Sequence, residues 1–134
     1  MSGFLSRAAL SLVAAVFILS AAPAKATQIE RVVSPGGIEA WLVEDHLNPI
    51  ISLHLAFRGG SALDPEGKEG LANMVSTLLD EGAGDLDSKA FQQTLEDNSI
   101  TLRFSAARDS LGARVQTLTE NRDLAFDLLR QAMT

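Results

Sequence analysis

Large apolar side chains alternate with small, polar or charged ones along residues 51–58, which read Ile-Ser-Leu-His-Leu-Ala-Phe-Arg. A period of two is typical of a half-buried strand. Two shorter runs before it, residues 29–33 and 38–44, flank the turn-forming sequence Ser-Pro-Gly-Gly and predict a β-hairpin. Residues 100–105 and 111–118 also alternate and predict two later strands.

Between these strands, residues 71–79 predict a helix, because apolar side chains recur every three to four positions. The side chains predicted to form its core-facing stripe are Leu71, Met74, Val75 and Leu78. A second helix is predicted from a cap at Asp87 or Ser88 to about residue 97, with Phe91 and Leu95 on its inner face.

The last helix is predicted to begin near Asn121 and to bury Leu124, Leu128 and Ala132, with Phe126 and Leu129 nearby. Strands and helices therefore come in runs rather than in strict alternation. This order favours an α+β fold, in which a largely antiparallel sheet carries its helices on one face.

The first 26 residues have the pattern of a secretory signal peptide. Arg7 precedes an uncharged apolar run, residues 8–22, and Ala24-Lys25-Ala26 has the small-x-small pattern of a cleavage site. This run is shorter than the roughly 20 apolar residues that span a bilayer, so cleavage is favoured over an uncleaved anchor. We expect residues 27–134 to form the mature part, without a stable membrane anchor, and to be periplasmic in a Gram-negative host.

The chain carries 17 acidic and 11 basic residues, a formal net charge of −6. An acidic chain lacks the positive surface by which proteins hold nucleic acid, so no nucleic-acid partner is expected. The absence of cysteine excludes disulfides and thiolate metal sites.

A specific motif follows the clearest strand. Gly59-Gly60 ends that strand, and residues 67–72 then read Gly-Lys-Glu-Gly-Leu-Ala at the start of a predicted helix. This segment resembles the approach to the zinc-binding helix of the pitrilysin, insulinase and processing-peptidase family, whose inverted motif is H-x-x-E-H. The resemblance extends over residues 27–134. It implies that these residues are the N-terminal part of an α+β peptidase-family domain, that is, a truncated and therefore incomplete processing-peptidase-like domain.

The positions of the zinc motif are occupied by other residues. Aligned on Gly-Leu-Ala, the first ligand position is Asn73, the general-base position is Ser76 and the second ligand position is Thr77. In the family two imidazoles four residues apart hold zinc and the Glu activates its water. An amide and a hydroxyl are poor zinc ligands, and serine is no base at neutral pH. The resemblance therefore supplies no catalytic residue and no metal ligand here; zinc is expected in the active members only.

Other side chains do not rebuild a metal site. The two histidines, His46 and His54, lack the spacing of a ligand pair and are expected at the surface. The acidic pairs are expected in solvated loops and at a helix end; they are Glu66 with Glu69 and Asp80 with Glu81. Trp41, the single tryptophan, is expected to pack in a core.

Three functions remain open. The resemblance implies an exported, non-catalytic homologue that acts as partner subunit of an active H-x-x-E-H peptidase and helps to enclose or bind unfolded peptide. The acidic charge of the chain would favour basic or unfolded peptides. The first alternative is a zinc-dependent peptidase with a non-standard site. The second is a truncated structural fragment without activity of its own, in which Leu128, Leu129 and Met133 leave apolar surface uncovered.

Overall fold

The computed structural model describes residues 27–134, which divide into two units, residues 27–45 and residues 46–134. The predicted signal peptide, residues 1–26, lies outside the described residues.

The first unit is the predicted β-hairpin. β1 (Ile29–Val33) pairs antiparallel with β2 (Glu39–Val43). The turn between them closes with a hydrogen bond from Gly37 N to Ser34 O of 2.9 Å, and Ser34 Oγ accepts a second one from Ile38 N at 3.0 Å. Gly37 has a φ of +81°, which glycine adopts at little cost. Turn chemistry and cross-strand pairing therefore define this unit.

Every side chain of the two hairpin strands is exposed. Trp41 retains 72% of its accessible surface, so the prediction that it packs in a core is wrong. The physical reason is that a two-stranded ribbon has no second layer of its own against which to bury a large side chain.

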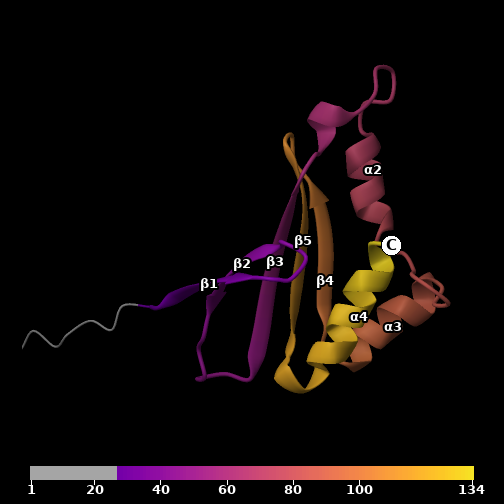
Figure 1. Cartoon of the computed structure of the whole chain (residues 1–134). Helices are drawn as coiled ribbons and strands as arrows, with labels where there is room; N and C mark the ends of the chain where they lie inside the picture. Colours follow the sequence, from indigo (N-terminus) through magenta and orange to yellow (C-terminus); the bar gives the residue numbers. More distant parts are fainter. Residues whose placement is uncertain (1–26) are drawn as a thin grey trace, which may run out of the picture. The chain divides into compact units, whose positions relative to one another are not determined.

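The second unit contains the other three strands. β3 (Ile50–Arg58), β4 (Thr101–Ala106) and β5 (Ser110–Leu118) form an antiparallel sheet in the order β3-β5-β4 (Figure 1). Alternate residues face the helices or solvent, as the period-two pattern predicts. The strands of the chain thus belong to two antiparallel sheets.

Three helices follow β3 in the sequence, two of them before β4 and the third after β5. They are α2 (Leu71–Leu78), α3 (Ser88–Asp97) and α4 (Arg122–Ala132), and short 3₁₀ turns occur at Ser61–Leu63 and Thr119–Asn121. α2 and α3 contact β4, whereas α4 contacts β5 (Figure 1). The predicted α+β arrangement with helices on one face of the sheet is confirmed. Within residues 27–134 no helix has the length and apolar character needed to cross a membrane.

One hydrophobic core joins these helices to the sheet. The predicted inner face of α3 is confirmed, because Phe91 is 0% exposed and Leu95 is 3% exposed. The remaining core side chains come from β4, β5, α4 and the residue before β4: Ile100, Leu102, Ala113, Val115, Ala125, Leu128, Leu129 and Ala132.

The buried face of α4 differs from the predicted one by one residue. Ala125 is 1% exposed, whereas Leu124 is 36% exposed, because the buried positions follow the spacing i, i+3, i+4, i+7 from Ala125. Leu128 and Leu129 pack in the core, so the prediction that they leave apolar surface uncovered is wrong. Met133 alone of that predicted group is exposed.

Candidate functional site

A loop carboxylate sets the start of α2, the helix that carries positions 73, 76 and 77. Asp64 Oδ2 accepts a hydrogen bond from Gly70 N at 2.7 Å, and Oδ1 accepts one from Ala72 N at 2.9 Å. The first amides of a helix have no partner within the helix, so this carboxylate does the work of a capping side chain. Gly70, the residue before the helix, has the left-handed φ of +94°.

The loop that holds Asp64 is itself fixed to the turn between β4 and β5. Gly59 N, Ser61 N and Ala62 N donate hydrogen bonds to carbonyls of that turn, at Asp109, Ala107 and Arg108 respectively. Gly60 lies so close to the turn that a Cβ would stand 2.2 Å from Ala107 O. The glycine pair at the end of β3 thus permits a close approach of two backbone segments.

The three substituted motif positions lie on α2 but do not converge on a site. Asn73 and Thr77 are exposed and lie four residues apart, hence on one face of the helix. Ser76 is 5% exposed, and it is the buried residue of the helix. Its Oγ donates to Asn73 O at 2.8 Å, and Thr77 Oγ1 donates to Met74 O at 2.9 Å. Both hydroxyls therefore bind the carbonyl three residues earlier on their own helix.

Residues 27–134 contain no group of three or more His, Asp or Glu side chains placed to hold a metal ion. His54 is exposed on β3, and His46 is exposed in the segment before it, as predicted. A zinc ion needs three or four converging ligands, and the residues of α2 offer an amide and hydroxyls instead. The donors present do not suit the zinc of an inverted-motif peptidase.

The acidic residues near α2 have structural partners. Glu81 Oε2 accepts from Ser88 Oγ at 2.7 Å, and Asp80 Oδ2 lies 3.7 Å from a guanidinium nitrogen of Arg103. Backbone amides of Glu69 itself and of Gly67 donate to the Glu69 carboxylate and hold its pKa below the ordinary value. The contacts of Asp80 and Glu81 tie the end of α2 to neighbouring segments, and those of Glu69 lie within the loop before the helix.

The predicted apolar stripe of α2 does not face the core. Leu71, Met74, Val75 and Leu78 are between 41% and 61% exposed, which contradicts their predicted burial. The helix turns Ala72 and Ser76 toward the covered side instead. The apolar moment of a helix reports which side chains avoid water, and it does not reveal whether a neighbouring element covers them.

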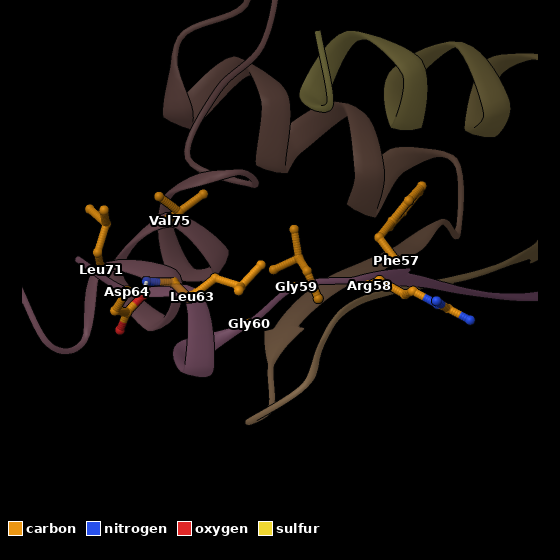
Figure 2. A pocket seen from close by; sticks show the side chains of 10 residues that line it. Phe57, Arg58, Gly59, Gly60, Leu63, Asp64, Leu71 and Val75 are labelled. Carbon is orange, nitrogen blue, oxygen red and sulfur yellow. Dashed lines mark hydrogen bonds between the residues drawn. The ribbon is translucent and has the colours of Figure 1, made fainter.

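Part of this apolar face borders a pocket of about 300 Å³ (Figure 2). Phe57 at the end of β3, Leu63 in the 3₁₀ turn, Leu71 and Val75 of α2, and Leu111 of β5 supply its apolar lining. The sequence predicts the elements around this pocket but not the pocket itself. The sequence pattern that could have indicated the pocket is the Gly59-Gly60 turn followed by an amphipathic helix.

The pocket is lined mainly by apolar side chains and glycine. Arg58 and Asp64 are the ionisable residues among those that line it, and both oxygens of Asp64 already accept amides of α2. Its lining includes no Ser, Thr, His or Glu. A hollow of this composition can take an apolar side chain, and it offers no nucleophile and no free base.

Comparisons with known proteins agree with this geometry. The chain is 34% identical over 90 residues to a Helicobacter pylori protein described as a non-peptidase homolog, YmxG; the match covers 67% of this chain and 21% of that protein. No family model matches the chain.

Two solved structures share the fold. An inactive peptidase M16 domain from Pseudomonas fluorescens superposes with a TM-score of 0.72 at 24% identity, over 78% of this chain and 26% of that one. A protease from Helicobacter pylori gives a TM-score of 0.68 at 20% identity, over 80% and 26% respectively.

The chain is therefore a homologue of the peptidase M16 (insulinase/pitrilysin) family. Its curated relative is described as a non-peptidase homolog, and the resemblance predicted from residues 67–77 is confirmed. The chain spans 21% of the length of its curated relative and 26% of each solved chain.

Proposed function

We propose that this M16 homologue is a non-catalytic partner that helps an active zinc peptidase to hold unfolded peptide. The observation that carries the proposal is that the motif positions of α2 hold residues unsuited to binding zinc. The three motif positions hold Asn73, Ser76 and Thr77, and both hydroxyls are bonded to the helix backbone. The relatives described as non-peptidase and inactive support the same reading.

Two features of the second unit support a role in holding peptide. The pocket beside α2 can receive an apolar side chain. β3 pairs with β5 on one side, and its other edge is unpaired within the described residues. An extended peptide can add to such an edge as a further strand. Because Phe57 and Arg58 at the end of β3 also line the pocket, the edge and the pocket are neighbouring parts of one surface.

The N-terminal sequence supports export. An apolar run followed by Ala24-Lys25-Ala26 is the pattern that signal peptidase cleaves. We propose that the chain acts in the periplasm when the host is Gram-negative, where its partner would be an exported peptidase with an intact H-x-x-E-H motif.

The zinc content of the folded chain tests the non-catalytic part. The full chain is purified, its fold is checked by circular dichroism, and bound zinc is measured by elemental analysis after dialysis against trace zinc. We expect far less than one zinc per chain. A stoichiometric, tightly held zinc would overturn this part and favour a peptidase with a non-standard site.

The partner and peptide-holding parts need separate measurements. Affinity purification of the tagged chain from its own host is expected to recover a protein with an H-x-x-E-H motif. Val75→Asp, which places a charge in the pocket lining, is expected to weaken the binding of an unfolded apolar peptide. Thr77→Asp adds the same charge to an exposed position of α2 that does not line the pocket, so it is the matched control. Equal effects of the two variants would contradict the role of the pocket.

A further inference from the structure

The sheet of the second unit has a face opposite the helices, and its charged residues are all basic. On this face the strands present the alternate residues that the core does not use. The ionisable ones are His54 and Arg58 on β3, Arg114 on β5 and Arg103 on β4. The others are uncharged, and Ile50 and Leu118 at one end of the face are the large apolar ones among them. No Asp or Glu of these three strands lies on the face, although acids outnumber bases in the chain.

The strand register places three of these side chains in one row. His54 lies opposite Arg114, and Arg103 lies opposite Arg114 on the other side. Directly opposed side chains of an antiparallel pair have Cβ atoms about 5 Å apart. Two guanidinium groups at such positions repel each other, and like charges placed directly opposite destabilise a sheet. The row therefore opposes the stability of the sheet on which it lies.

The described residues neutralise little of this charge. Arg103 reaches Asp80 at 3.7 Å while 65% of its side chain stays exposed, and one of its nitrogens donates to Leu102 O. Arg58 and Arg114 form no ion pair within residues 27–134, and both are exposed. Arg58 extends away from the apolar pocket (Figure 2). At least two guanidinium groups thus present donors to an external acceptor.

We propose that this face binds an acidic stretch of extended peptide, whose carboxylates pair with Arg114, Arg58 and Arg103. The inference rests on the peptide-holding part of the proposed function. It adds a second contact surface, on the face of the sheet opposite the pocket, and names the charge of the segment bound there. It replaces the expectation from net charge alone, which favoured basic peptides. Guanidinium groups bind carboxylates through paired N–H donors, so charge complementarity points to Asp- or Glu-rich segments. The acidic remainder of the chain disfavours the long polyanion of a nucleic acid.

Fluorescence anisotropy with labelled ten-residue peptides tests the proposal. The full chain is titrated against an oligo-Glu peptide, a neutral Gly-Ser-Thr peptide, an oligo-Lys peptide and a single-stranded oligonucleotide. We expect the oligo-Glu peptide to bind most tightly and its affinity to fall as salt is raised. Arg114→Gln is expected to weaken that binding about five-fold, which is the contribution of a favourable exposed ion pair.

Matched variants separate the outcomes. Arg114→Lys keeps the charge and should retain most of the affinity, and Arg122→Gln removes an arginine of α4 and should leave it unchanged. Circular dichroism confirms that each variant is folded. Neutral peptide bound as tightly as oligo-Glu, with no effect of Arg114→Gln, would overturn the inference and leave the proposed peptide-holding role standing. Binding of none of these peptides would overturn the inference, whereas the peptide-holding role is decided separately by the apolar peptide and Val75→Asp. Tighter binding of the oligonucleotide would overturn the acidic-peptide assignment.

Discussion

The interactions within the first unit of the chain differ from those within the second. In the hairpin of residues 27–45, strand pairing, turn chemistry and an exposed ion pair define the structure, and every strand side chain is exposed. In residues 46–134, a sheet and three helices bury a continuous apolar core. An isolated two-stranded ribbon is marginally stable in water, whereas a sheet that packs against helices is stable by itself. Folding stability should therefore be located almost entirely in the second unit.

The largest expected effect comes from the centre of the core. Phe91→Ala removes a fully buried ring and should lower the free energy of unfolding by about 3–5 kcal/mol. Trp41→Ala, in the hairpin, should change it by less than about 0.5 kcal/mol because the ring is 72% exposed. Urea denaturation followed by circular dichroism measures both. Comparable losses would show that the hairpin shares the stability of the core.

A pair of glycine substitutions sharpens the same contrast. Gly60→Ala forces a Cβ to within 2.2 Å of Ala107 O at a φ of +95°, and should cost about 3 kcal/mol. Gly37→Ala in the hairpin turn has a similar φ of +81° but no atom within 4 Å, so only the left-handed backbone cost of about 1 kcal/mol remains. Equal costs in thermal or urea unfolding would mean that the close approach at Gly60 relaxes freely.

Loss of a side-chain acceptor of backbone amides should also cost more stability in the second unit than in the hairpin. Asp64→Ala leaves Gly70 N and Ala72 N without their acceptor and should cost about 1–2 kcal/mol. Ser34→Ala removes one exposed bond to Ile38 N and should cost about 0.5 kcal/mol. Amide hydrogen exchange at Ala72 should accelerate in the first variant. Unchanged exchange there would show that another group caps α2.

The smallest effect concerns the ion pair of the hairpin. Arg31 donates two hydrogen bonds of 2.7 Å to Glu39, and these lower the pKa of the Glu39 carboxyl. A lowered pKa stabilises the folded form above the unfolded pKa, and this contribution is lost as pH falls through the folded pKa. Acidification below the ordinary carboxyl range should therefore loosen the strand pairing.

An NMR titration of the Glu39 carboxyl measures this pKa directly. Arg31→Gln should return it toward its ordinary value, and high salt should do so in part, because both side chains are exposed. An unchanged titration in the variant would contradict the ion pair as the cause.

The sequence predicts the strands more reliably than the faces of the helices. The alternation along residues 51–58 and 111–118 predicts β3 and β5, because each strand has one face on the core and a period of two reveals it. The cap at Asp87 also predicts the start of α3, where Asp87 Oδ1 accepts from Ala90 N at 2.8 Å. Both signals lie within one short segment, so they can be recognised in the sequence without knowledge of tertiary contacts.

The misplaced faces depend on contacts between distant segments. On α4 an alanine occupies the position expected for Leu124, because small side chains can pack in a core as well as large ones. On α2 the apolar stripe is exposed, because the described residues supply no element to cover it. Hydrophobicity along a helix cannot distinguish these cases.

The candidate site divides in the same way. The motif at residues 67–77 predicts the loss of zinc ligands from residue types alone. The pocket, the contact of Gly60 with Ala107 and the basic row that includes Arg114 require the register of β5 with its neighbours. Such features arise from tertiary pairing and have no pattern within any one segment.

The hydrogen bonds of Asp64 to the first turn of α2 have a consequence for the motif positions of that helix. One carboxylate, two backbone amides and the left-handed Gly70 fix where α2 begins, and none of them belongs to positions 73, 76 or 77. The start of the helix is thus set by residues other than those at the motif positions. Asn73 and Thr77 are exposed, so the side chains at these two positions can change while the start of α2 stays where it is.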